Sequence, residues 1–337
     1  MHDEIGEKAA PGWVARPERS NTLAIRFIVW VALTLGRRMA RVFLYPACLY
    51  FLLFAREART ASKKYLRKVL GREPRISDGF RHIHTFASTI LDRVFLLNGC
   101  FDKFDVHTHL DDKARAMIAN RQGCILLGAH LGSFEITRAY ADEIEGPPAS
   151  VVMSEENARQ LNSVLKAINP ALSQQVIGLG KIDSMLKVEQ ALQRGEFIGI
   201  LADRGLEQGG ASVTCDFLGE PARFPSGPLR MAYMLKSPVL LMAGVYRGGN
   251  RYDLYFEELM DMSNAELPRN ELIRQAQQRY VARIEHYCRN APYNWFNFYD
   301  FWKQRCALCS CCCVLLPPSP AQKPIHPPLL LSGGCRN

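Results

Sequence analysis

The stretch that decides the fold reads Cys124-Ile125-Leu126-Leu127-Gly128-Ala129-His130-Leu131-Gly132-Ser133-Phe134-Glu135. Its first six residues are apolar and fit a buried strand, and Gly132 and Ser133 can open a helix behind them. In open α/β sheets, ligands bind at the carboxyl ends of the strands. His130 stands at such an end, with Glu135 five residues later, so we predict that His130 is a general base.

The His-x-x-x-x-acid spacing by itself is weak, and the chain contains it twice more. His2 precedes Glu7 in a polar N-terminal stretch, and His107 precedes Asp112, which reads better as first-turn helix charge. Only His130 follows an apolar strand. The alternative interpretation of His130 is a core or helix-capping histidine without a catalytic role.

Apolar strand-like runs alternate with helical runs through the middle of the chain. This alternation predicts an α/β fold with a mostly parallel sheet flanked by helices, and a helix of one apolar face at residues 80–97 leads into it. The predicted strands are 124–129, 150–153, 175–179, 197–202, 239–246 and 252–256, and the predicted helices between them are 134–144, 158–168, 182–193 and 227–235.

Charge is concentrated at the N-terminus of this 337-residue chain, which is 48% hydrophobic and has a net charge of +9. Residues 1–75 carry 15 Lys and Arg against 6 Asp and Glu, and the remainder is balanced at 27 against 27. A nucleic-acid-binding protein would spread its positive charge over the folded face, so we expect no nucleic acid partner.

The basic N-terminus contains two apolar runs, 23–35 and 42–55, separated by Arg37, Arg38 and Arg41. Each is shorter than the roughly 20 residues of a spanning helix. We therefore predict an interfacial or re-entrant helical hairpin with arginines at anionic headgroups, followed by a basic surface helix at 56–70. The alternative is a buried helical pair that caps the domain, and no cleaved signal peptide is expected.

These patterns divide the chain into four parts. We expect a polar N-terminus at 1–22, a membrane-associated basic helical segment at 23–76, a catalytic domain at 77–305 and a Cys- and Pro-rich tail at 306–337. Five cysteines crowd the start of the tail, but their spacing makes a poor tetrahedral zinc site, so we predict disorder there.

Two further candidate sites follow the strand pattern. Asp203 and Arg204 come directly after the apolar run 197–202, where an arginine can hold a developing negative charge, although a surface ion pair is an equal alternative. The loop from Arg223 through Ser226 and Gly227 precedes a helix whose N-terminal amides can bind an anion.

Together these residues resemble the late lipid A acyltransferases, of the lauroyl/myristoyl type, within the lysophospholipid acyltransferase superfamily. The resemblance runs from about residue 23 to 303 and rests on the HxxxxE motif at 130–135, Asp203-Arg204, and the segments 217–228 and 294–299. Glutamate rather than aspartate in the motif favours the lipid A branch. Residues 66–99 and 295–302 are also similar to acyltransferases from aryl-polyene biosynthesis clusters.

The resemblance implies a membrane-bound O-acyltransferase on the cytoplasmic face of a bacterial inner membrane. The donor would be an acyl-carrier-protein thioester or acyl-CoA, and the acceptor a hydroxyl of a lipid or glycolipid. His130 would be the base, Glu135 would orient and charge its imidazole, Arg204 would stabilise the oxyanion and Asp203 would shape the pocket. No cofactor or metal is implied.

The remaining candidate substrate-binding residues are Ser133, Arg159, Arg223, Ser226 and Gly227. Many relatives carry an arginine after the second strand, where this chain reads Val152-Met153-Ser154-Glu155, and Arg159 can substitute for it. Ser133 lies in no Gly-x-Ser-x-Gly elbow and is not expected to be a nucleophile. The competing function is a noncatalytic lipid-binding or scaffold protein on the same fold.

Overall fold

The computed structural model describes residues 19–143, 146–155, 159, 168, 176–179, 183–204, 211–263 and 267–302. The tail predicted at 306–337, most of the polar N-terminus at 1–22 and nearly all of the helix predicted at 158–168 lie outside the described residues.

The centre of the molecule is a seven-stranded sheet in the order β1-β9-β8-β2-β5-β3-β4. Every neighbouring pair is parallel except β8 and β9, which form an antiparallel pair. The predicted α/β class with a mostly parallel sheet is thus confirmed. The strands are β1 (Asp105–Leu110), β2 (Cys124–Gly128), β3 (Ala149–Ser154), β4 (Val176–Leu179), β5 (Phe197–Leu201), β8 (Pro238–Gly248) and β9 (Arg251–Asp261).

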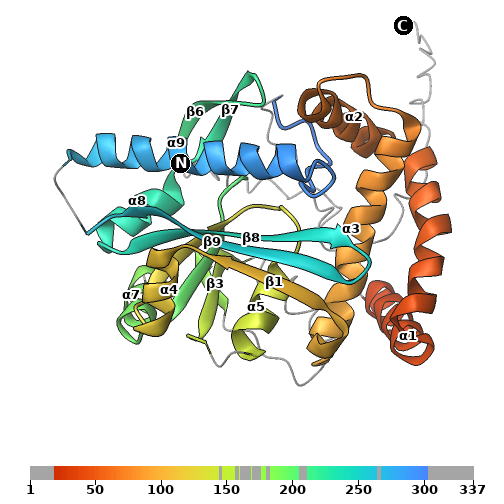
Figure 1. The fold of residues 1–337 in the computed structure, drawn as a ribbon, viewed down its shortest axis with the longest axis horizontal. Coiled ribbons are helices and arrows are strands. Elements are labelled where there is room, and N and C mark those ends of the chain that lie inside the picture. Colours follow the sequence, from red (N-terminus) through yellow and green to blue (C-terminus); the bar gives the residue numbers. More distant parts are fainter. Residues whose placement is uncertain are drawn as a thin grey trace, which may run out of the picture.

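Helices cover both faces of this sheet (Figure 1). The helices beyond the N-terminal segment are α3 (Ile76–Leu96), η1 (Phe101–Lys103), α4 (Asp112–Ala119), α5 (Phe134–Glu143), α7 (Asp183–Gln193), α8 (Gly227–Met234) and α9 (Arg269–Asn290), and a separate hairpin consists of β6 (Ser212–Phe217) and β7 (Glu220–Pro225). Because side chains alternate along a strand, Ile125 and Leu127 join the core with α9, whereas Cys124 and Leu126 join the core with α4 and α5.

The sequence patterns did not predict β1 or α9. The strand β1 lies at the sheet edge with its side chains only half-buried or exposed, so its sequence Asp-Val-His-Thr-His-Leu lacks an apolar run. The helix α9 does bury one stripe, including Leu272, Tyr280 and Ile284, but its other face is densely charged. An averaged hydrophobicity therefore obscured its 3.6-residue period.

The N-terminal segment consists of α1 (Arg19–Phe54) and α2 (Arg56–Leu70). Gly36 interrupts α1 with φ 77° and ψ 164°, so the two apolar runs form two helical segments around a kink. No single helix in the described part of the chain passes a length and hydropathy test for crossing a membrane, whereas residues 29–54 and 56–70, bent by 93°, pass it together.

Arginine side chains attach α1 to the body of the protein. Arg37 donates through Nε and Nη2 to the two carboxylate oxygens of Asp92 on α3, each at 2.7 Å. The Tyr252 hydroxyl donates to the same carboxylate at 2.7 Å. Asp92 is fully buried, so its charge depends on these partners. The segment 23–55 is therefore docked on the catalytic domain through a buried ion pair.

Replacing Arg37 with alanine is expected to lower the free energy of unfolding by about 3–5 kcal/mol, because it leaves the buried Asp92 carboxylate without its cation. Urea unfolding followed by circular dichroism measures the loss. Arg38→Ala is the matched control on the same helix: Arg38 is exposed, and its loss should change stability by less than about 0.5 kcal/mol. Equal stabilities of the two variants would contradict a structural ion pair at Asp92.

Candidate active site

His130 follows β2 and is held by backbone contacts to the segment after α9. The amide of Phe296 donates to the His130 carbonyl at 2.7 Å, and the amide of Gly132 donates to the Asn294 carbonyl at 2.8 Å. Leu131 and Trp295 form an antiparallel bridge between these hydrogen bonds. Residues about 165 positions apart in the sequence thus share one short ladder, and this ladder fixes the backbone on both sides of the imidazole.

Two glycines allow the chain to pass this closely beside β8. Gly132 has φ 69°, and a Cβ built there would stand 1.8 Å from the Gly244 carbonyl oxygen. A Cβ on Gly244 would stand 2.3 Å from the Ser133 carbonyl oxygen. Neither position has room for a side chain, and the left-handed conformation of Gly132 would add strain for any other residue. The turn from β2 into α5 therefore depends on both glycines.

Asp203 is the carboxylate that contacts the imidazole. It follows β5, which pairs with β2 in parallel, so both residues leave the same edge of the sheet. Its Oδ1 lies 2.8 Å from His130 Nδ1, and its Oδ2 accepts from the His130 amide at 3.1 Å. The indole Nε1 of Trp295 donates to Oδ2 at 3.0 Å. Asp203 therefore has a donor on each oxygen while being only 1% exposed.

The ionisation states of this pair follow from its surroundings. Burial opposes the Asp203 charge, but the His130 imidazole, Arg204 and the His130 amide outweigh burial and hold the pKa of Asp203 well below its usual range. An ionised carboxylate only accepts hydrogen bonds, so His130 Nδ1 carries a proton. In the neutral imidazole, Nε2 then has the free lone pair of a base.

The pKa of His130 is lowered from its ordinary value. Burial is the largest cause, the cation of Arg204 adds to it, Asp203 partly opposes it, and Arg93 contributes a further lowering. The side chain is still 23% exposed. The imidazole is therefore neutral at pH 7 and accessible, which is the state that accepts a proton.

Glu135 contacts an arginine. Its Oε1 lies 2.8 Å from Nη2 of Arg93 on α3, and no hydrogen bond joins Glu135 to His130 among the described residues. The orientation of the imidazole, expected from the resemblance to come from Glu135, is supplied in this structure by Asp203. The sequence could not reveal this exchange because Asp203 is 73 positions away and reaches His130 only through the β2–β5 pairing.

Arg204 lies beside the imidazole, as its effect on the pKa of His130 indicates. Its Nη2 donates to the Phe296 carbonyl at 2.8 Å, and its guanidinium stands 5.2 Å from the centre of the Tyr299 ring. His130, Asp203 and Arg204 are thus brought together, as a cation next to a base and its carboxylate.

The other predicted site residues have different contacts. Ser133 is buried, and its hydroxyl accepts the Ile136 amide at 3.4 Å, which makes it an N-terminal cap of α5. Ser226 is buried and donates to the Ala211 carbonyl at 3.1 Å, while Arg223 donates to the Ser212 hydroxyl at 2.7 Å. Gly227 and Arg159 are exposed. None of these printed contacts connects them to His130.

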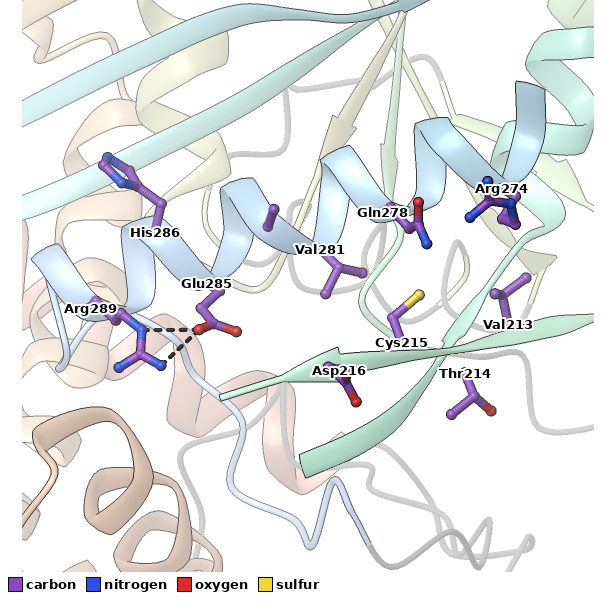
Figure 2. A pocket seen from close by; sticks show the side chains of 11 residues that line it. Val213, Thr214, Cys215, Asp216, Arg274, Gln278, Val281, Glu285, His286 and Arg289 are labelled. Carbon is purple, nitrogen blue, oxygen red and sulfur yellow. Dashed lines mark hydrogen bonds and ion pairs between the residues drawn. The ribbon is translucent and has the colours of Figure 1, made fainter. Parts of the chain in front are cut away.

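An open groove of about 680 Å³ lies elsewhere, between β6 and α9 (Figure 2). Its cations are already paired: Arg289 with Glu285 at 2.7 Å, and Arg274 with Glu271 at 2.6 Å. None of the predicted site residues lines this groove. It is therefore distinct from the His130 site.

The comparisons with known proteins agree with the geometry of the His130 site. The family model described as bacterial lipid A biosynthesis acyltransferase matches residues 104–304. The chain belongs to this family. It is accordingly an enzyme that transfers acyl groups, with a lipid as the acceptor class. Among curated proteins no match was found.

Three residues around the base of this acyltransferase were not predicted from the sequence. Trp295 donates to Asp203, Arg93 pairs with Glu135, and His82 is buried beneath Trp295. The sequence placed His82 on a helix in a solvent or packing role, and Trp295 only in a motif. The one available signal was that an arginine and a histidine recur on the inward side of the apolar helix 80–97.

Proposed function

We propose that the protein moves a fatty acyl group from an acyl-carrier-protein thioester, or from acyl-CoA, to a hydroxyl of a lipid or glycolipid, with His130 as the general base. The observation that carries this proposal is the His130–Asp203 pair at 2.8 Å, with Nε2 unprotonated and the ring partly exposed. A carboxylate that fixes the tautomer of a histidine base is the arrangement used in acyl-transfer enzymes.

In the proposed reaction, His130 Nε2 accepts the proton of the acceptor hydroxyl while the oxygen lone pair attacks the thioester carbonyl. The carbonyl π electrons move onto oxygen and form a tetrahedral oxyanion. When this intermediate collapses, the carbon–sulfur bond breaks, and the departing thiolate takes the proton from the imidazolium. The ester and a free thiol are the products, and His130 is neutral again.

Arg204 is proposed to stabilise the oxyanion. It is close enough to the imidazole to lower the pKa of His130, so it is also close to the carbon that the activated hydroxyl attacks. A fixed cation next to a developing negative charge lowers the barrier without reorganisation during the reaction. Its bonds to the Phe296 carbonyl and the Tyr299 ring keep it in place.

Glu135 is proposed to control the basicity of His130 through Arg93. The Arg93 cation lowers the pKa of His130, and the ion pair at 2.8 Å compensates that cation. This role differs from a direct contact with the imidazole. It retains Glu135 as a functional residue and gives the glutamate of the HxxxxE motif a distinct, weaker effect than that of Asp203.

Glu135→Ala is therefore expected to move the acid limb of the kcat/KM profile further below pH 6.5, because an uncompensated Arg93 lowers the pKa of His130 more. A weaker base also transfers protons more slowly, so kcat/KM at neutral pH should fall by roughly ten-fold. Steady-state rates between pH 5 and 9 measure both effects. An acid limb that moves to higher pH would contradict this role of Glu135.

The lipid substrate is proposed to be reached at the cytoplasmic face of a bacterial inner membrane. Large apolar side chains of α1 are exposed, and they include Trp30, Leu35, Val42, Phe43, Leu53 and Phe54. Next to them, α2 carries Arg56, Arg59, Lys63 and Arg67 along one exposed side at spacings of three and four residues. Exposed aromatic and aliphatic groups beside basic residues fit an anionic membrane surface.

Replacing Phe43 and Phe54 together with aspartate is expected to release most of the protein from vesicles containing anionic lipid, because charged groups cannot enter the interface. Flotation of the full-length protein with such vesicles measures binding. Both rings are more than half exposed, so folding should be unaffected. Leu186→Asp, at an exposed site on α7, is the control. Unchanged flotation of the Phe43/Phe54 variant would disprove α1 as the membrane surface.

The proposed reaction is tested by incubating the full-length protein with an acyl-carrier-protein thioester or acyl-CoA and a lipid A precursor. Mass spectrometry should find the acceptor heavier by one acyl group, and an excess of one donor type should identify the preferred carrier. Lipid binding without any acyl transfer from either donor would instead support the noncatalytic lipid-binding alternative.

A further inference from the structure

We propose that Trp295 and His82 are positioning residues for His130: the Trp295 indole fixes the Asp203 carboxylate, and His82 fixes Trp295. This inference rests on the proposed role of His130 as the base. It extends that site by two buried layers that the reaction itself does not touch.

Trp295 is attached to the base at two places. Its indole N–H donates to Asp203 Oδ2 at 3.0 Å, while Oδ1 of the same carboxylate contacts His130 Nδ1 at 2.8 Å. Its backbone pairs with Leu131, directly after His130. With a donor on each oxygen, the carboxylate has one preferred rotation, and that rotation points Oδ1 at the imidazole.

His82 holds Trp295 from the opposite side. Its Nε2 lies 2.9 Å from the Trp295 carbonyl oxygen, and its Nδ1 lies 2.8 Å from the Ser62 hydroxyl on α2. A carbonyl only accepts, so Nε2 carries the proton and Nδ1 accepts from Ser62. Burial lowers the pKa of His82 to about 4. The ring therefore stays neutral, and its tautomer is fixed by its two partners.

Aromatic packing alone does not account for these donors. Trp295 lies in a cluster with Tyr65, Phe217, Phe301 and Trp302. Trp302 belongs to the same cluster, yet its buried indole nitrogen has no hydrogen-bond partner. The cluster thus accommodates an indole without using its N–H group. At Trp295 the N–H is aimed at the carboxylate that orients the base.

The first test compares Trp295→Phe with Trp302→Phe, since both keep an aromatic ring and remove one indole N–H. Trp295→Phe should lower kcat about ten-fold with KM unchanged, the order expected for a lost hydrogen bond to a charged group. Its acid limb should move to higher pH, because Asp203 with one donor fewer stabilises the imidazolium more. Trp302→Phe should leave kcat and the pH profile at wild-type values.

The second test uses His82. Glutamine can donate from a similar position to the Trp295 carbonyl, so His82→Gln should keep most of the activity, whereas His82→Leu should lose about ten-fold in kcat. His84→Leu is the control on the same helix, since His84 Nε2 has no hydrogen-bond partner. This set decides the question if Trp295→Phe fails to fold. Equal rates for His82→Gln and His82→Leu would overturn the role of His82.

A His130→Ala variant in the same assay separates the two proposals. If His130→Ala is as active as wild type, His130 is not the base and the proposed function is wrong at this site. If His130→Ala is inactive while Trp295→Phe matches Trp302→Phe in rate and pH profile, the positioning role is wrong and the base stands.

Discussion

His130→Ala is expected to lower kcat/KM for acyl transfer by at least about 100-fold, the lower end of the contribution of a positioned general base. Without the imidazole, the acceptor hydroxyl has no group to take its proton during attack on the thioester. The variant should fold, because the backbone hydrogen bonds of residue 130 to Phe296 and Asp203 do not involve the imidazole. Rates with a defined acyl donor, beside a thermal melt, measure both expectations.

The control for His130 is His107→Ala, which has an acid at the same spacing. His107 lies on the edge strand β1, and its exposed imidazole is 3.0 Å from Asp105. It has no connection to the sheet edge that carries His130, so its loss should leave kcat/KM close to wild type. An inactive His107→Ala together with an active His130→Ala would move the site and refute the proposed base.

Asp203→Asn is expected to lower kcat/KM by about 1,000-fold or more, because it reverses the imidazole tautomer. The His130 amide and the Trp295 indole both donate to Oδ2, so an asparagine would place its oxygen there and its amide NH2 toward His130 Nδ1. Nδ1 would then become the acceptor, and Nε2 would hold the proton. A protonated Nε2 cannot act as a base.

Nitrogen NMR of labelled histidine can report this tautomer change directly. Asp216→Asn, at an exposed position on β6, should change neither the tautomer nor the rate. The double variant of His130→Ala and Asp203→Asn should be little worse than His130→Ala alone, because residues that act as one unit are not additive. A multiplicative loss in the double variant would show that Asp203 acts independently of His130.

Much of the site-bearing half of the fold could be predicted from local patterns. The strands around His130 and Asp203 are continuous apolar runs because parallel strands are covered on both faces, and all residues of β2 are buried. The edge strand β1 and the charged helix α9 escaped prediction because a half-exposed element has too little apolar sequence to stand out. The Cys-rich tail, its predicted disorder and the domain limits remain predictions.

The sequence alone determined that a histidine follows a buried strand and that an aspartate and an arginine follow another, because the apolar runs end there. Only the tertiary structure decided which carboxylate meets the histidine. The pairing of β2 with β5 brings Asp203 to His130, and α3 supplies Arg93, which takes Glu135. Spacing along the chain reports residues that share one element, whereas sheet pairing and helix packing decide which charges are neighbours in space.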